Sequence, residues 1–468
     1  MTTADIAPDF EKGGDDRAIL GQPRGVYFLA FTEAWERFSF YGMVALVVLY
    51  MTQQLLLPGH IEHVAGMAGF RAALESIFGP LSTQALASQI FGYYTGLVYF
   101  TPVFGGLVAD RWLGAKRAVI AGAVLMSAGH FVMAFEQSFL VALLLLILGS
   151  GLLKGNIAAQ VGQLFSVHDE SQRTRAYAIF SMGVNVGAVA GPLGCGLVAQ
   201  LYGWDVGFGL AGVMMLVAMI TFLAGSRHLP DRRPVRAERL ALPPLNRVER
   251  RHVILLIAVM AITVFHSVAY YQLFNVGIVW VDAHANLATP AGQIPTPWFN
   301  SIDAFFSVIC VPPLIALWRW QATRQREPGD LAKIGIGAAF MAGSALLLAF
   351  SASLAGNGRT TVLLPFTAFA LSGVAFLYYW PPLLALVSRA APAKVNATMM
   401  GISYLTLFVA NSLMGQIGGL YEKMTAIQFW MLNAGIASIG ALIVLLFGKM
   451  LTRALSGESA PDLVTAPT

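Results

Sequence analysis

The amino-acid sequence predicts an all-α membrane protein with twelve transmembrane helices arranged as two six-helix bundles. Of its 468 residues, 57% are hydrophobic and only 11% are charged, whereas a soluble globular chain carries about 25% charged residues. Apolar stretches of about 20 residues, the length that crosses a bilayer as a helix, recur along the whole chain. These features argue against a soluble enzyme, a nucleic-acid-binding protein and a disordered protein.

The hydropathy of the chain predicts where each span lies. In order, the twelve spans are expected at residues 25–53, 88–111, 117–135, 138–163, 174–200, 204–226, 252–281, 298–320, 332–354, 360–389, 395–420 and 426–452. Several exceed the roughly 20 residues that a bilayer requires, so tilted or protruding helices are expected. The runs are continuously apolar, unlike the alternating strands of a membrane barrel.

The basic residues orient these spans. With a cytoplasmic N-terminus, 24 of the 29 lysine and arginine residues fall on the inner side, and only Arg71, Arg359 and Lys423 fall outside. Cytoplasmic loops of membrane proteins are enriched in these residues, so both termini are expected inside. Residues 1–24 lack an apolar core, so no cleavable signal peptide is expected. We therefore expect a multi-pass protein of the plasma (inner) membrane.

A proline- and arginine-rich loop at 227–251 divides the chain. It separates an N-terminal six-helix bundle (1–226) from a C-terminal six-helix bundle (252–468) and is expected to be a cytoplasmic linker. Two such halves suggest pseudo-symmetric bundles with a binding site at their interface. The other long loop, 54–87, is expected outside, and its amphipathic pattern around Phe70–Phe78 indicates a short surface helix.

Five charged residues lie deep within the predicted spans: Glu33, Glu36, Arg37, Lys154 and Asp303. Charge within a bilayer is costly, so such residues face a cavity or a partner and mark a functional site by default. The alternative is a buried ion pair that only locks helices together. The functional reading is favoured because three of the five cluster in the first span.

The first-span cluster predicts proton binding. Glu33, Glu36, Arg37 and Tyr41 share one face of a helix, because residues three and four apart are neighbours on its surface. One guanidinium cannot neutralise two carboxylates, so one of them is expected to bind and release a proton. Lys154 supplies a second cation, and together with Arg37 it could hold a carboxylate of the substrate.

The first span also carries the most specific motif in the chain. TEAWERFSFYG, at Thr32–Gly42, resembles the ExxERFxYYG signature of the proton-dependent oligopeptide transporters (the POT/PTR family) of the major facilitator superfamily. Gly105–Arg117 resembles the superfamily loop between spans two and three. Gly149–Asn156 is similar to the span-four motif with its lysine, Phe180–Ala188 to a span-five stretch with an asparagine, and Ile294–Phe306 to the segment leading into span eight.

This resemblance implies the major facilitator fold and a proton-driven symporter that imports di- and tripeptides by alternating access. It implies that Glu33, Glu36, Arg37 and Lys154 couple protons, and that Arg37 and Lys154 also receive the C-terminal carboxylate of the peptide. It further implies pocket positions at Tyr41, Tyr99 and Asn185, and it matches Gln272 to a span-seven glutamine of the family.

The sequence departs from the family pattern at four positions. Tyr271 and Val44 stand where the family has a span-seven glutamate and its span-one basic partner, so both halves of that salt bridge are absent. Phe376 stands in place of the span-ten glutamate that receives the peptide amine. Asp303 stands in place of a span-eight asparagine.

Asp303 is therefore a candidate to replace part of the missing charge. Our hypothesis is that it pairs with Lys154 or Arg37 across the cavity, or anchors a substrate amine. The alternative is that it caps a helix start near the outer face. Tyr271 and Trp380 are expected either to line a substrate pocket or to pack at a membrane interface. Pro312–Pro313 indicates a kink or break in span eight.

The sequence also limits the possible partners. No metal-ligand spacing, hydrolase triad or Walker motif is present in the sequence, so neither an enzyme nor an ATP-driven pump is expected. Protons are the only expected cofactor, as the coupling ion. The expected partners are small peptides and membrane lipids, without nucleic acid, and the protein is expected to be a monomer. A proton-coupled carrier of another small anionic or zwitterionic solute, or a non-transporting peptide sensor, remains an alternative.

Overall fold

The chain folds almost entirely into long helices. The structure is a computed structural model, which describes residues 17–19, 21–165, 170–230, 244–290, 292–356 and 358–456. The helices of the first half are α1 (Arg24–Tyr50), α2 (Met67–Phe78), α3 (Thr83–Val108), α4 (Ala115–Val132), α5 (Phe139–Gln163), α6 (Glu170–Tyr202) and α7 (Trp204–Gly225). Those of the second half are α8 (Arg247–Gln272), α9 (Ile278–His284), α10 (Phe299–Ile309), α11 (Val311–Thr323), α12 (Asp330–Ala355), α13 (Leu363–Ala390), α14 (Asn396–Gly418) and α15 (Ala426–Ser456).

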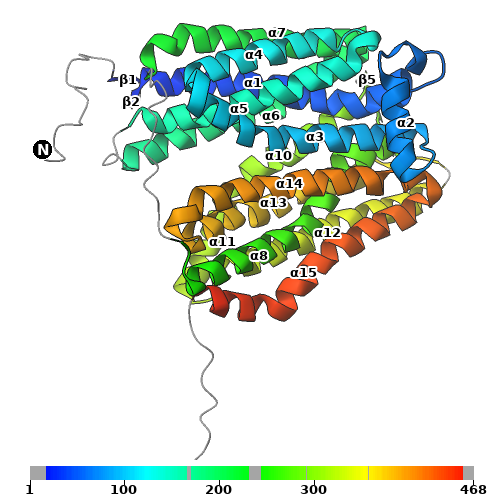
Figure 1. Cartoon of the computed structure of the whole chain (residues 1–468). Helices are drawn as coiled ribbons and strands as arrows, with labels where there is room; N and C mark the ends of the chain where they lie inside the picture. The colour runs from blue at the N-terminus through cyan, green and yellow to red at the C-terminus, as the bar shows by residue number, and fades with distance from the viewer. Residues whose placement is uncertain are drawn as a thin grey trace, which may run out of the picture.

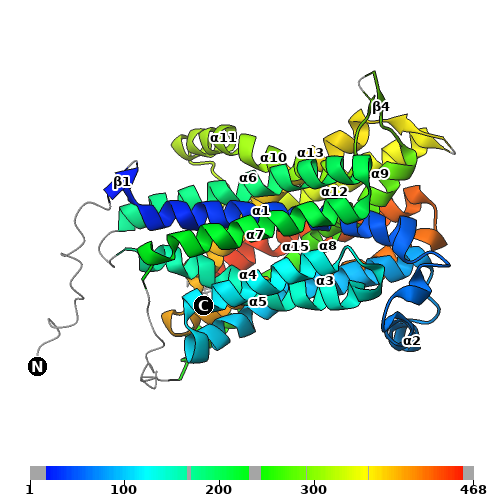
Figure 2. The same cartoon turned by 90° about the horizontal axis from the view of Figure 1, so that it is seen from above.

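The helices make twelve crossings, as expected for the predicted fold class. Nine helical segments of the described residues are long and apolar enough to cross a membrane, and the bent pair α10 and α11 makes a tenth. α3 and α4 run alongside them and complete the set (Figures 1 and 2). Figure 1 shows α1, α4 and α7 on one side of the molecule, and α8, α12 and α15 on the other.

In the described part of the chain, short strands occur only in the segments outside the helices. β1 (Arg17–Ile19) pairs antiparallel with β2 (Gln22–Pro23) next to the start of α1. At the end of the molecule that carries α2, β3 (Ala285–Asn286) pairs parallel with β6 (Thr360–Thr361), and β4 (Ala288–Thr289) pairs antiparallel with β5 (Gly292–Gln293).

The outer surface of the helices is apolar. Leu445 is 79% exposed, Ile220 is 62% exposed and Phe31 is 59% exposed, although all three lie within long helices, at least five residues from the nearer end. In water such a surface would be unfavourable, whereas hydrocarbon accommodates it. The protein is therefore a multi-pass membrane protein.

The helix boundaries follow local signals. α8 begins at Arg247, five residues before the predicted span, because Asn246 and Glu249 form a capping box that satisfies backbone N–H groups. α3 begins after Ser82, whose side chain accepts from the Ala85 amide. Lys12 and the linker residues Arg232, Arg233, Arg236 and Arg239, which contribute to the predicted inner charge, lie outside the described residues.

Two features of the loops and breaks were predicted. The loop at 54–87, which the sequence predicts on the outside, contains a short helix, α2, which begins three residues before the predicted amphipathic segment. Span eight breaks at Cys310, where α10 and α11 meet at 40°. Pro312 and Pro313 lie in the first turn of α11, where their missing N–H groups leave no helical hydrogen bond unmade.

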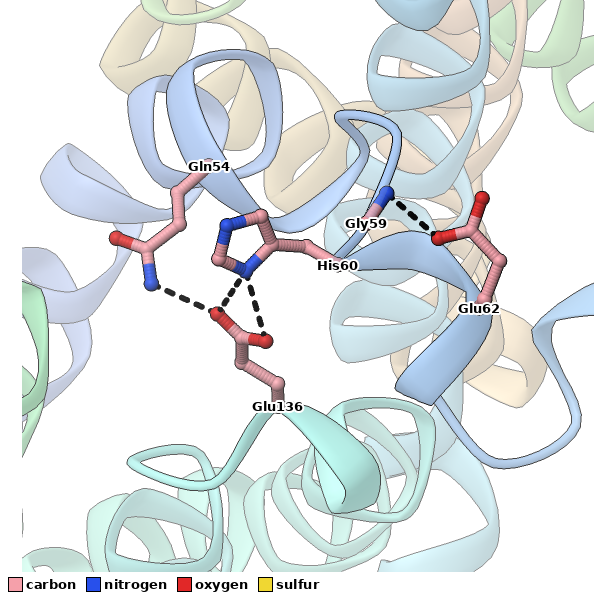
Figure 3. A network of polar contacts seen from close by, with 5 residues as sticks. All are labelled: Gln54, Gly59, His60, Glu62 and Glu136. Carbon is pink, nitrogen blue, oxygen red and sulfur yellow. Dashed lines mark hydrogen bonds and ion pairs between the residues drawn. The ribbon is translucent and has the colours of Figure 1, made fainter.

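Polar contacts near α2 tie the first half of the chain together. Figure 3 shows Glu136, between α4 and α5, which accepts a hydrogen bond from Gln54 Nε2 at 2.7 Å. His60 Nδ1 lies 2.9 and 3.0 Å from the two oxygens of the same carboxylate. The segment after α1 is thereby fixed to the connection between α4 and α5.

Glycines bring α6 into backbone contact with α1. A Cβ atom at Gly183 would collide with the Ala30 carbonyl oxygen, one at Gly187 with the Ala34 carbonyl oxygen, and one at Gly191 with the Phe38 carbonyl oxygen. The three glycines are four residues apart and therefore form one stripe on the helix. Small residues at this spacing allow close helix packing in membranes. This contact fixes the face of α1 that carries Arg37.

Replacing Gly187 with alanine is expected to destabilise the protein. The new Cβ would meet Ala34 O, Arg37 Cβ and Phe38 N, and only the second of these belongs to a side chain. Overpacking of this kind costs about 1–3 kcal/mol. Thermal unfolding in detergent should show a lower midpoint. Gly209→Ala in α7 is the matched control, because nothing lies within 4 Å of the added atom. An equal unfolding midpoint for both variants would show that the contact between α1 and α6 accommodates the added methyl group without a loss of stability.

Candidate transport site

The first-span cluster is a buried group of three charges on α1. Arg37 Nε donates to Glu33 Oε1 at 2.7 Å, and Glu36 Oε2 lies equally close to the same nitrogen. Glu36 is fully buried, and Glu33 and Arg37 are 4% and 8% exposed. Neither oxygen of Glu36 has a hydrogen-bond partner among the described residues. The two carboxylates therefore share one guanidinium, and its N–H points to Glu33.

Lys154 is held by aromatic rings beside this cluster. Its ammonium nitrogen lies 4.0 Å from the centre of the Phe40 ring and 5.3 Å from that of Tyr99. No carboxylate of the described part of the chain lies within 4.0 Å of it. The guanidinium of Arg37 is 5.8 Å from the same Phe40 ring. Both cations thus lie near the Phe40 ring, and cation–π attraction compensates part of their lost hydration.

Asp303 lies on the opposite bundle and is paired with a tyrosine. The Tyr270 hydroxyl donates to Asp303 Oδ2 at 2.7 Å, and Asp303 is only 8% exposed. Its other oxygen has no hydrogen-bond partner among the described residues, and the nearby Ser372 hydroxyl donates to Phe369 O. Asp303 does not cap α10, which starts at Phe299, and no described cation lies within 4.0 Å of it. The structure therefore shows a tyrosine where the sequence suggested Lys154 or Arg37.

Aromatic residues connect the two charged groups. The Tyr271 hydroxyl donates to the Tyr99 hydroxyl at 3.1 Å, so a residue of α8 meets a residue of α3. Tyr270 lies next in the chain with its ring 5.2 Å from Tyr271, and it stacks on Phe376 at 5.9 Å. Phe376, which stands in place of the span-ten glutamate of the resembled family, thus supplies an aromatic face here. A continuous row of contacts runs from Arg37 to Asp303.

The remaining predicted site residues lie outside the row of contacts from Arg37 to Asp303. Tyr41 is half-buried on α1, in electrostatic range of both Arg37 and Asp303. Trp380 packs edge-to-face on Tyr404 at 5.3 Å, and its ring also contacts Tyr379.

Gln272 is fully buried, where its side chain accepts a hydrogen bond from Asn275 and donates one to Met414 O within the C-terminal half. Asn185 is half-buried on α6, and its side chain has no hydrogen-bond partner among the described residues.

The bundles are joined by hydrogen bonds in the halves of the helices nearest α2. Donors and acceptors come from both bundles, and α3 also packs closely on α14 through Gly92. The bonds run from Gln53 to Asp282 (2.8 Å), from Ser88 to Asn275 (3.2 Å), from Thr95 to Asn411 (2.8 Å), from Trp298 to Leu193 O (3.0 Å) and from Ser301 to Val189 O (2.7 Å). The α2 end of the interface is therefore closed.

Two residues of this site carried little signal in the sequence. Tyr270 was one of several aromatic residues in its span, and its contact with Asp303 joins positions 33 residues apart. Phe40 belongs to the first-span motif, but its position under Lys154 depends on how α1 packs against α5. The adjacent pair Tyr270–Tyr271, in an otherwise apolar span beside a π-helical turn at Leu273–Gly277, was the available hint.

Comparison with known proteins assigns the chain to a family. A sequence model of the POT family matches residues 116–241 and 245–437, which is more than half of the chain. The chain belongs to the POT family.

Similar proteins extend this assignment over nearly the full length of this POT protein. It is 29% identical to a di-/tripeptide transporter of Lactococcus lactis subsp. cremoris, over 93% of this chain and 97% of that protein. It is 28% identical to the uncharacterized transporter YclF of Bacillus subtilis (strain 168), over 95% and 98% of the two chains.

Solved structures support the same assignment. The crystal structure of the peptide transporter POT in complex with sulfate aligns with a TM-score of 0.82 and 25% identity, covering 94% of this chain and 97% of that one. The fold of this POT protein is therefore the predicted major facilitator fold.

Proposed function

We propose that this chain is a proton-coupled symporter that imports di- and tripeptides by alternating access. The observation that carries the proposal is the row of contacts from Arg37 through Phe40, Lys154, Tyr99, Tyr271 and Tyr270 to Asp303, which spans both bundles. It places cations at one end and a carboxylate at the other. A peptide zwitterion has the complementary charges, and one of the similar proteins is described as a di-/tripeptide transporter.

The substrate carboxylate binds at Arg37 and Lys154. Lys154 faces aromatic rings without a carboxylate partner among the described residues, so its ammonium group is available to an anion. The Arg37 guanidinium lies 5.8 Å from the centre of the same Phe40 ring. Tyr41, Tyr99 and Asn185 supply polar groups around this end.

Proton coupling takes place at Glu33 and Glu36. With both carboxylates ionised, the cluster on α1 carries one more negative than positive charge in a buried site. A proton on Glu36 removes this excess and weakens the hold of the carboxylates on Arg37. The guanidinium then becomes free to engage the substrate, which links proton binding to substrate binding.

The substrate amine binds at Asp303, and Tyr270 positions this carboxylate. One Asp303 oxygen is held by the Tyr270 hydroxyl, and the other remains free to accept from an ammonium group. Tyr271, Phe376 and Trp380 provide apolar and aromatic surface for peptide side chains. Gln272, at the end of α8, fixes this helix to α14 through its hydrogen bond to Met414 O. The lost family carboxylates are thus partly replaced by one on span eight.

The closed α2 end corresponds to a state with access from the opposite side. The segments that connect the helices at the α2 end carry few basic residues, namely Arg71, Arg359 and Lys423. Most lysine and arginine residues lie at the opposite end of the helices. We assign the α2 end to the outside of the plasma (inner) membrane, with both termini cytoplasmic. The two six-helix bundles, 1–226 and 252–468, rock about the site, and the transporter works as a monomer.

Transport by the purified protein tests this function. The full-length protein is reconstituted in liposomes, an inward-directed proton gradient is imposed, and uptake of labelled dialanine is followed. Dialanine should accumulate, and di- and tripeptides should compete better than single amino acids or other small anions. Binding of dialanine without flux would identify a sensor instead. Accumulation of a competing anion but not of dialanine would identify a different substrate.

Replacing Lys154 with glutamine is expected to weaken peptide transport. The change removes a charged hydrogen-bond donor to the substrate carboxylate, which contributes about 1.5–3 kcal/mol and so a ten- to hundred-fold rise in KM. The measurement is the concentration dependence of dialanine uptake. Lys449→Gln, on the exposed face of α15, is the matched control. A normal KM for Lys154→Gln would place the carboxylate elsewhere.

A further inference from the structure

The break in span eight separates α11 from the bundle. α10 and α11 meet at 40° beyond Cys310, and none of the residues of α11 is buried. Figure 2 shows α11 at the edge of the molecule, at the same end as β1. A helix that leaves its neighbours in this way opens space beside it.

The space between α11 and the neighbouring helices forms a groove with a volume of about 270 Å³. Its walls are formed by apolar side chains and the ring of one tyrosine: Pro313, Leu314 and Leu317 of α11, Phe340 of α12, and Val374 and Tyr378 of α13. The core of a bilayer contains no water that could fill such a groove. A hydrocarbon chain is the occupant that matches its surface.

The groove leads to tryptophans and cations. Gln321 follows Leu317 by four residues on the same face of α11, and Arg324 is the residue directly after the end of this helix. Arg324 lies 4.3 Å from the centre of the Trp320 ring. Lys333 lies 4.0 Å from the centre of the Trp318 ring. Tryptophan and basic residues together are typical of the headgroup level of a membrane.

The groove ends beside Trp318, which packs edge-to-face on Tyr378 of its wall at 5.6 Å. The indole N–H of Trp318 is buried and has no acceptor among the described residues, and Gln321 Oε1 likewise has no donor there. Trp318, which contacts the groove wall through Tyr378, therefore carries a hydrogen-bond donor that no described residue uses.

The acidic residues at this end are already paired. Lys333 donates to Glu327 at 2.6 Å, and Arg389 donates to Asp330 at 2.8 Å. Within the described ranges, no carboxylate lies within 4.0 Å of Arg324. Its guanidinium is therefore available to an anion, and arginine matches the geometry of phosphate.

We propose that this groove binds an anionic glycerophospholipid. One acyl chain lies along Leu317 and Val374, its ester carbonyl accepts from Trp318 Nε1, and its phosphate contacts Arg324. Basic pockets between transmembrane helices on the cytoplasmic side bind anionic headgroups in this way. None of the residues that line the groove belongs to the row of contacts between the bundles, so the proposal does not depend on the transported solute.

Native mass spectrometry of the full-length protein in detergent tests the site. Phosphatidylglycerol and phosphatidylcholine with identical acyl chains are titrated separately. The protein should bind phosphatidylglycerol more tightly, and Arg324→Gln should weaken that binding about five-fold, as expected for one basic residue near an anionic lipid. Val374→Phe, which fills the groove, should weaken binding of both lipids.

Arg319→Gln is the matched control, because Arg319 lies on the opposite face of the same helix. It should leave phosphatidylglycerol binding unchanged, and the acyl-free headgroup glycerophosphoglycerol should not compete. Equal affinity for the two lipids, an equal loss in Arg319→Gln, unchanged binding in Val374→Phe, or competition by the acyl-free headgroup would each overturn the proposal.

Discussion

Replacing Glu36 with glutamine is expected to abolish proton-driven accumulation of dialanine in proteoliposomes. Glu36 is fully buried and has no hydrogen-bond partner among the described residues, so its charge is balanced only by the cations around it. Glutamine mimics the protonated state permanently. Without a carboxylate that can ionise at this position, the cluster keeps the charge it has when Glu36 is protonated and cannot release the coupling proton, so accumulation should fall to the level reached without a proton gradient.

Counterflow separates loss of coupling from loss of binding. In Glu36→Gln, exchange of labelled for unlabelled dialanine across the membrane should persist, because exchange needs no net proton movement. Glu62→Gln makes the same chemical change at an exposed position near α2 and should behave like the unmodified protein. If Glu36→Gln still accumulated dialanine against its gradient, this carboxylate would not carry the coupling proton.

Replacing Asp303 with asparagine is expected to raise the KM for dialanine strongly. The change removes the carboxylate that we assign to the substrate amine, and losing one partner of a buried charged pair costs about 2–5 kcal/mol. The expected rise in KM is therefore at least about thirty-fold. The measurement is uptake of dialanine compared with N-acetyl-dialanine, which lacks the ammonium group.

Two comparisons make this result specific. The KM for N-acetyl-dialanine should already be high in the unmodified protein and should change little in Asp303→Asn. Tyr270→Phe removes the hydroxyl that holds Asp303 Oδ2 and should raise the KM for dialanine by a smaller factor. Equal KM values for dialanine in Asp303→Asn and the unmodified protein would contradict amine recognition at this position.

Much of the fold could be predicted because a bilayer imposes simple rules on a sequence. Each span must be apolar and about 20 residues long, so the helices could be located from hydropathy alone. The cluster of Glu33, Glu36 and Arg37 could also be predicted, because its members are near one another on a single helix. The break near Pro312 followed from the local chemistry of proline.

Contacts between helices could not be predicted in the same way. The partner of Asp303 is Tyr270, on the preceding membrane crossing, and nothing in the local pattern distinguishes this tyrosine from Tyr271. Lys154 could be recognised as a buried cation, but not as one that rests on Phe40. Such contacts depend on how helices rotate and pack, and sequence periodicity fixes only which face of a helix is polar.

The closure near α2 determines how easily the transporter changes state. Most of its bonds join neutral groups, such as Thr95 with Asn411 and Ser88 with Asn275, and of the five bonds only Gln53–Asp282 includes a charge. A neutral hydrogen bond exchanged for one with water contributes only about 0.5–1.5 kcal/mol. The closed arrangement is therefore a shallow minimum, and modest differential binding of a peptide or a proton can shift the population. Because few ions are separated on opening, the balance between the two states should be nearly independent of ionic strength.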